Sequence, residues 1–133
     1  MLPVVVACLK SGDGLRIIEQ PELHIHPALQ VSLGDLFIET IQSEDNPENP
    51  LSSLLIETHS EHIILRLIRR IREKFEDELP ENAIGLDPSD VSVYYVQDTA
   101  KGVQFKKLRI DEEGEFIDRW PKGFFDERAA ELF

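Results

Sequence analysis

Several features that would assign this 133-residue sequence to a familiar class are missing from it. Cys8 is its only cysteine, so no internal disulfide can form, which fits a reducing compartment such as the cytoplasm. No apolar run approaches the roughly 18 residues needed to span a bilayer. The apolar start, "MLPVVVACLK", has no preceding positive charge and no convincing cleavage site, so it does not read as a signal peptide. We therefore expect a cytoplasmic protein without a membrane partner.

Basic residues are scarce as well. The chain has 14 lysines and arginines against 26 acids, a net charge of −12. Such a field repels nucleic acid and anionic membranes unless a local basic patch overrides it. The one such patch, "RLIRRIREK" at 66–74, carries Arg66, Arg69, Arg70 and Arg72. We expect a solvated helix face balanced by the acids that follow, with a contact to DNA or an effector as the alternative.

Helical and strand patterns alternate along the chain. They predict a helix over 2–10, a strand over 15–20, a helix from 27, a strand over 51–58, a helix from 60, strands over 91–97 and 103–110, and a helix from about 126. Such alternation favours an α/β fold with parallel strands flanked by helices. The last two strands form a hairpin that we expect to add an antiparallel edge to the sheet.

The helix from 60 has the clearest signals. Ser60 is a good N-cap, and an apolar face repeats at helical spacing. The residues assigned to that face are Ile64, Leu67, Ile68, Ile71 and Phe75.

Polar side chains follow two of the predicted strands where each one ends. "LRIIEQPELHIHP" (15–27) places Glu19, Gln20 and Glu22 after the first, and "LLIETHSEH" (54–62) places Glu57, Thr58 and His59 after the second. Open α/β sheets bind ligands beyond the carboxyl ends of their strands. An acid there suits Mg²⁺ beside phosphates, the next residue can orient or deprotonate water, and a histidine can contact a γ-phosphate.

These stretches resemble the Walker B strand, D-loop and switch histidine of ABC-type ATPases, in the branch that includes SMC-, RecF- and OLD-like proteins. The chain looks most like the C-terminal half of the AAA-type ATPases of the OLD-like group. A small domain of unknown function follows in that group, and "VSVYYVQ", "RIDEEGEF" and "RWPKGFFDE" resemble its elements. The resemblance implies a partial P-loop NTPase (ABC-type) lobe over 1–88 and an accessory region over 89–133.

The resemblance also implies roles for individual residues. Glu19 takes the acid on the Mg²⁺ side, and Gln20 takes the position of the catalytic glutamate. Glu22 would flank the attacking water and His59 would sense the γ-phosphate. His26, in the D-loop, and Thr58 would lie at the ATP site. ATP and Mg²⁺ would bind between this chain and an N-terminal lobe.

Two departures from the family limit what the chain can do alone. It has no GxxxxGK[ST], so phosphates have no glycine-rich cradle, and the amide of Gln20 cannot accept a proton. Its bare apolar start also reads like the middle of a buried helix. We therefore expect a fragment, inactive by itself. Its partners would be the N-terminal ATPase lobe, a second copy in a homodimer, and an effector protein or DNA.

Two other classes of function stay open. Glu22, His24 and His26 could hold a metal ion with Glu57, His59 or His62, as in a metal-dependent hydrolase, although the spacing matches no strong zinc signature. Alternatively, the amide at position 20 could mark a non-catalytic interaction module. The same polar residues could also be no more than a solvated loop.

Overall fold

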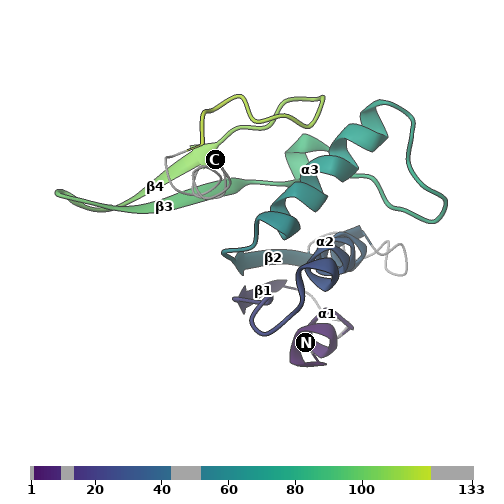
Figure 1. Cartoon of the computed structure of the whole chain (residues 1–133), viewed down its shortest axis with the longest axis horizontal. Coiled ribbons are helices and arrows are strands. Elements are labelled where there is room, and N and C mark those ends of the chain that lie inside the picture. Colours follow the sequence, from purple (N-terminus) through teal and green to yellow (C-terminus); the bar gives the residue numbers. More distant parts are fainter. Residues whose placement is uncertain (1, 10–13, 43–51, 121–133) are drawn as a thin grey trace, which may run out of the picture. The chain divides into compact units, whose positions relative to one another are not determined.

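The computed structural model describes residues 2–9, 14–42 and 52–120 (Figure 1). Its elements are α1 (Leu2–Leu9), β1 (Gly14–Glu19), α2 (Pro27–Gln42), β2 (Ser52–Glu57), α3 (Glu61–Phe75), the 3₁₀ helix η1 (Pro88–Asp90), β3 (Val93–Thr99) and β4 (Gly102–Leu108). The chain divides into two compact units. One comprises the chain to Leu67 with Pro80–Gly85, and the other comprises Ile68–Leu79 with the chain from Leu86 onward.

The first unit is built on a parallel pair of strands. β1 and β2 pair in parallel, with Ile17 opposite Leu55 and Glu19 opposite Glu57. Parallel strands need a crossover, which α2 supplies beside the pair (Figure 1). A mixed α/β fold with a parallel sheet is therefore confirmed for the described residues.

One face of this sheet is packed and the other is open. The packed face forms a core with the helices, made of Cys8, Ile18, Leu33, Phe37 and Ile63. On the opposite face Leu15, Ile17 and Leu55 are 60%, 63% and 55% exposed. Because side chains alternate along a strand, a run such as "LRIIE" supplies apolar residues to both faces. The described helices cover only one of them.

The helices α2 and α3 approach closely within this unit. A Cβ added at Gly34 would lie 2.7 Å from Cγ of Arg66, so only glycine fits there. The predicted N-cap of α3 is confirmed, because Ser60 Oγ accepts a hydrogen bond from the Ile63 N–H at 3.2 Å.

The second unit contains an antiparallel hairpin. β3 and β4 pair from Val93 with Leu108 to Thr99 with Gly102, as the ribbon in Figure 1 shows. Among the described residues the hairpin is a two-stranded sheet of its own. The expectation that it extends the parallel sheet is therefore wrong.

A compact turn follows the hairpin. Arg109 holds Asp118 with its backbone N–H and through a forked guanidinium contact, at 2.8–3.0 Å. The guanidinium and then the backbone N–H of Arg109 lower the pKa of Asp118 to about 2. Asp111 Oδ1 accepts the N–H groups of Glu113 and Glu115, which folds the turn around Gly114. Phe116 and Trp120 meet edge to face, with ring centroids 4.7 Å apart.

The buried face of α3 differs from the prediction in two positions. Ile68 and Ile71 are buried as expected, but Phe75 is 55% exposed and Ile63 is buried instead. Apolar spacing alone fitted both assignments, and packing selects one of them.

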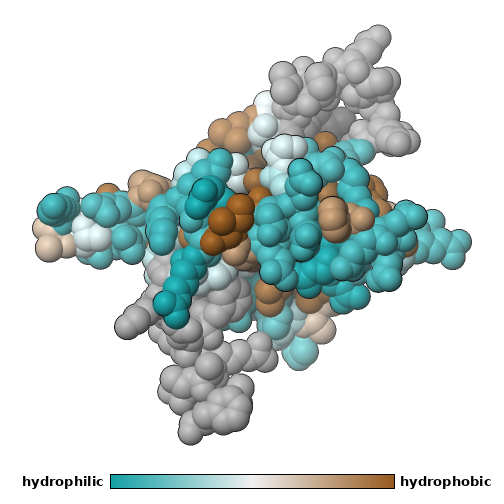
Figure 2. All heavy atoms as spheres, turned by 90° about the horizontal axis from the view of Figure 1, so that it is seen from above, coloured by the Kyte–Doolittle hydropathy of each residue, from teal (hydrophilic) through white to brown (hydrophobic). Residues whose placement is uncertain are grey.

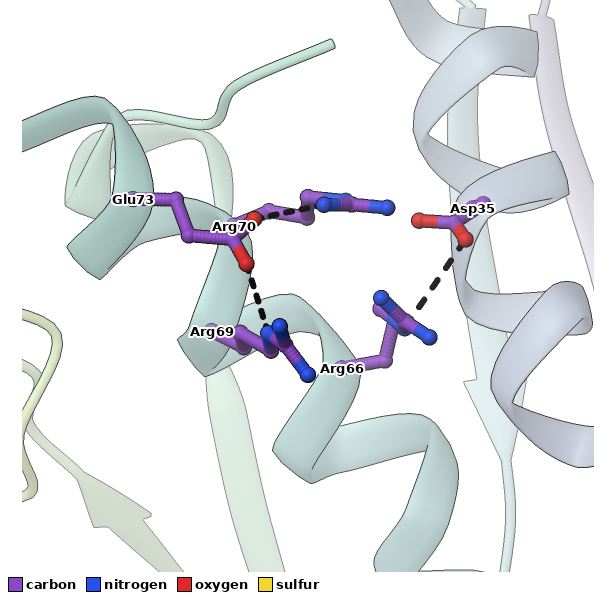
Figure 3. A network of polar contacts seen from close by, with 5 residues as sticks. All are labelled: Asp35, Arg66, Arg69, Arg70 and Glu73. Carbon is purple, nitrogen blue, oxygen red and sulfur yellow. Dashed lines mark hydrogen bonds and ion pairs between the residues drawn. The ribbon is translucent and has the colours of Figure 1, made fainter. Parts of the chain in front are cut away.

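The arginines of α3 differ in their exposure, since Arg69 and Arg72 are exposed whereas Arg70 is buried. Arg70 is buried and donates to Glu73 at 2.5 Å, and Arg69 donates to the same carboxylate at 2.6 Å (Figure 3). Arg66 pairs with Asp35 at 3.8 Å, also drawn in Figure 3. Arg72 lies 3.7 Å from a carboxylate oxygen of Glu115. The expectation of a solvated face is therefore wrong for Arg70, and the described acids already engage the basic patch.

The helix expected from about 126 lies outside the described residues. None of the helices that the structure describes has the length and apolar character needed to cross a bilayer.

Candidate functional site

The candidate site is the edge of the first unit where β1 and β2 end. We call it the rim and define it as Glu19–His26 together with Glu57–Ser60. Glu19 and Glu57 are register partners, so their side chains project to the same side of the sheet. Beyond the last pair, the Gln20 N–H donates to the Glu57 carbonyl oxygen at 2.8 Å. The two polar stretches that the sequence placed after separate strands therefore meet at one edge.

The segment leaving β1 has an unusual backbone. Gln20 and His24 have φ angles of +45° and +61°, in the left-handed region that non-glycine residues seldom adopt. Two tight turns hold it, with the Leu23 N–H donating to the Gln20 carbonyl at 3.1 Å and the Ile25 N–H donating to the Glu22 carbonyl at 3.0 Å. Strained backbone of this kind costs on the order of 1 kcal/mol per residue and clusters at functional sites.

Glu22 fastens this segment to the neighbouring strand. One carboxylate oxygen accepts the Thr58 hydroxyl at 2.8 Å, and the other accepts the His59 backbone N–H at 2.6 Å. Hydrogen bonds to a charged acceptor are about twice as strong as neutral ones. We call this arrangement the Glu22 clamp. An acid in this turn therefore has a structural role, because its carboxylate connects the turn to Thr58 and His59, which follow Glu22 by 36 and 37 positions in the sequence.

A second connection runs beneath the clamp, and sequence reasoning missed it. Gln30 Nε2 donates to the Ile25 carbonyl at 2.9 Å, and Gln30 Oε1 accepts the Ser60 hydroxyl at 2.6 Å. The Ser60 N–H in turn donates to Thr58 Oγ1 at 3.0 Å. Gln30 lies on α2 in an ordinary helical pattern, so nothing in the sequence singled it out.

His26 has a structural role in the described residues. Its Nδ1 accepts the Ala28 N–H at 3.2 Å, and its carbonyl accepts the N–H of Leu29 at 2.8 Å. It therefore caps the first turn of α2. His26 as a whole is exposed at the rim, so this role does not test the expectation of a ligand contact.

The remaining rim groups are exposed. Glu19, Gln20, Glu57 and His59 are all accessible to solvent. Within the described part of the chain, no hydrogen bond or ion pair engages the carboxylates of Glu19 and Glu57 or the imidazole of His59. Two carboxylates at one sheet edge supply hard oxygen ligands of the type that Mg²⁺ prefers. An exposed imidazole beside them can donate to an anionic oxygen.

The alternative metal site gains no support from the geometry. Among residues 2–9, 14–42 and 52–120, no three histidine, cysteine, aspartate or glutamate side chains come together as a metal-binding group. The spacing of His24 and His26 put them in one loop, but His26 turns its Nδ1 to the α2 backbone.

Comparison with known proteins reaches only the second part of the chain. Residues 86–133 match the model of a family described as a protein of unknown function, DUF3696. No curated protein matches the chain, and no solved structure does either. The C-terminal region therefore resembles a family without an assigned activity.

Proposed function

We propose that this chain is part of an ABC-type ATPase of the OLD-like group, and that its rim faces Mg²⁺ and the phosphates of ATP. The nucleotide itself would be held by a P-loop lobe outside these 133 residues. The observation that carries the proposal is the parallel register of β1 and β2, which sets Glu19 and Glu57 side by side with His59 two residues beyond.

The composition of the rim fits this ligand. Glu19 would hold the metal, directly or through water, because its carboxylate is exposed and unengaged in the described residues. Bound Mg²⁺ would neutralise charge on the phosphates and so favour attack by water. The Glu22 clamp fixes the backbone of His59, which leaves the imidazole free to contact a terminal phosphate oxygen.

The groups that would handle water are less well equipped. Gln20 can orient a water molecule but cannot take its proton. Glu22 is poorly placed to act as the base instead, since both of its oxygens already accept hydrogen bonds. A missing general base costs roughly 10²–10⁴-fold in rate, so we propose slow hydrolysis with Gln20 as a positioning group.

The order of the motifs gives separate support. In the OLD-like group a small domain of unknown function follows the ATPase, and here a family of unknown function matches residues 86–133, after the rim segments. ATP hydrolysis would then be coupled to a homodimer, and to an effector protein or DNA, as the resemblance implies.

The test uses the longer protein that the proposal requires. The coding sequence upstream of Met1 should encode GxxxxGK[ST]. In that protein, Glu19→Gln should lower kcat for ATP by about 10²-fold or more, because the metal loses a charged ligand. Glu39→Gln is the matched control, since Glu39 is an exposed acid on α2 outside the rim.

Two results would reject the proposal. One is an upstream sequence without any phosphate-binding motif. The other is a Glu19→Gln variant that hydrolyses ATP as fast as the Glu39→Gln control.

A further inference from the structure

The hairpin β3–β4 exposes one apolar face. Register pairs alternate between its two sides, and one side carries the pairs Tyr94–Lys107, Val96–Phe105 and Asp98–Val103. On this side Tyr94, Val96, Val103 and Phe105 are 54%, 53%, 63% and 71% exposed. We call the six residues of the three pairs on this side the hairpin face.

Such a face has a cost for the protein. A two-stranded hairpin is marginally stable in water unless its apolar side packs against something. Within the described residues, no hydrogen bond or ion pair engages the side chains of Asp98 or Lys107, at opposite ends of the face. The hairpin face therefore has apolar area in its middle and an uncommitted charge at each end.

The charges are arranged so that the face is complementary to itself. The Tyr94–Lys107 pair makes one end basic, Val96–Phe105 makes the middle apolar, and Asp98–Val103 makes the other end acidic. We propose that the hairpin face binds the hairpin face of a second copy of this chain, with Val96 and Phe105 at the two-fold axis.

Only one of the two face-to-face arrangements suits these charges. If the two-fold axis runs across the strands, the basic end of each copy lies on the acidic end of the other. Lys107 then lies near Asp98 of the other copy, twice by symmetry. If the axis runs along the strands, the two Lys107 ammonium groups come together. Like charges disfavour the second arrangement, so we infer the first.

Pairing through the strand edge is less favourable than pairing through the face. β4 carries Lys106 and Lys107 in succession, and lysines on an outer strand oppose pairing with another strand. The face is also small. Seven-residue strands at about 3.3 Å per residue give an area well below the roughly 800 Å² per partner of a stable dimer. The dimer should therefore be weak, with a Kd in the micromolar range or above.

The test is a charge exchange followed by analytical ultracentrifugation of the 133-residue chain over a wide concentration range. The unmodified chain should dimerise with rising concentration. Asp98→Lys and Lys107→Asp should each raise the Kd about tenfold or more, because two attractions become repulsions. Glu112→Lys, an exposed position off the hairpin face, is the control, since it changes the net charge by the same amount as Asp98→Lys.

Mixing gives the decisive result. An equimolar mixture of the Asp98→Lys and Lys107→Asp chains should form a heterodimer, because one hairpin face is then wholly basic and the other wholly acidic. The double variant Asp98→Lys/Lys107→Asp should recover homodimerisation. Circular dichroism establishes that each variant is folded, and Asp98→Asn with Lys107→Gln replaces the pair if it is not.

The proposal is overturned by a chain that stays monomeric at every concentration. It is also overturned if Asp98→Lys and Glu112→Lys dimerise alike, which would indicate another surface, such as the open face of β1–β2. The proposal is overturned as well if the mixture of the Asp98→Lys and Lys107→Asp chains forms no heterodimer. None of these outcomes bears on ATP, so this inference stands apart from the proposed function.

Discussion

A single carboxylate organises the rim. The residue after the conformationally restricted Gln20–Pro21 step could have projected into solvent, but the turn directs Glu22 toward the end of β2. There it accepts two hydrogen bonds at 2.6 and 2.8 Å. Its role in the described structure is thus to fix the position of His59, whereas the sequence predicted a group beside the attacking water. The two roles differ in what a substitution should do.

Glu22→Gln should loosen the segment that carries His59. Glutamine loses the negative charge, and its single oxygen can accept only one of the two hydrogen bonds that the carboxylate accepts. A hydrogen bond to a charged group contributes about 1.5–3 kcal/mol, so exchange of the His59 amide with deuterium should accelerate about tenfold or more. Amide exchange followed by NMR measures this. An unchanged His59 rate, equal to that of the Glu39→Gln control, would show that the clamp does not form.

Gly114→Ala should destabilise the second unit by about 1–3 kcal/mol. Gly114 has a φ of +74°, and an added Cβ would lie 2.7 Å from the Ile68 carbonyl oxygen and 3.0 Å from the Arg72 nitrogen. Gly102→Ala is a matched comparison, because its φ is +100° but nothing lies within 4 Å of the added Cβ. Thermal unfolding should show the larger loss for position 114. Equal losses would mean that backbone strain alone accounts for both.

Part of the site could be read from the residues and part could not. The meeting of Glu19, Glu57 and His59 at one edge could be predicted, because each lies at the end of an apolar strand and the strand ends of a parallel sheet share an edge. The hydrogen bond between Gln30 and Ser60 could not be predicted, because it depends on how α2 packs against the start of α3. A polar residue on a helix gives no sign of the partner that tertiary packing brings to it.

At the scale of elements, the start of α3 was predicted well and its buried and exposed faces less well. Its described start at Glu61 follows the capping Ser60, as the sequence indicated. Four arginines in a short stretch favoured a solvated face, yet Arg70 is buried against Glu73. Residues three apart on a helix are neighbours, so the sequence could have predicted the ion pair between Arg70 and Glu73. The sequence could not predict that the pair is buried, because burial depends on the residues that cover it.

Glu73 gives α3 a measurable pH dependence. Burial acts to raise the pKa of Glu73, but hydrogen bonds from Arg69 and Arg70 outweigh it, and the pKa lies below its ordinary value of 4.5. A lowered folded-state pKa means stability that is complete above pH 4.5 and is lost as the pH falls through the folded value. Thermal melts should show this loss below pH 4.5, and Glu73→Gln should reduce it. A variant with the acid dependence of the unmodified chain would indicate that other carboxyls dominate.

The hairpin shows the limit of element prediction. Its strands and its turn were legible in β-branched and aromatic residues, and β3 and β4 confirm them. Its separation from the parallel sheet was not legible, since both arrangements use the same two strands. The alternation of side chains along β3 and β4 makes one side of the hairpin apolar whether or not it joins the parallel sheet. Only the structure shows that this side is exposed.

For the whole molecule, composition predicted the character of the surface, but it did not predict the boundary between the two units. A net charge of −12 fits the mostly hydrophilic surface in Figure 2, where hydrophobic side chains emerge in separate patches. The division into two compact units was not foreseen at its observed boundary, because α3 contributes to both. A helix shared between units has no composition break to mark the change.

In the longer protein that we propose, Gln20→Glu distinguishes slow catalysis from none. A carboxylate at this position would supply the missing general base, and kcat for ATP should rise by about 10²-fold. The φ of +45° at position 20 is equally accessible to both residues, so the backbone should tolerate the exchange. Steady-state phosphate release measures the rate. An unchanged rate would favour the non-catalytic interaction module over the ATPase.

The 133-residue chain alone should neither bind nor hydrolyse ATP. Its sequence has no GxxxxGK[ST], and the rim offers carboxylates to a metal but no cluster of backbone N–H groups to a triphosphate. Isothermal titration with Mg²⁺ and ATP should therefore give no binding heat, and phosphate release should equal that of buffer. Turnover that copurifies with the chain, falls on Glu19→Gln and survives Glu39→Gln would show that these residues form a complete active site without another lobe.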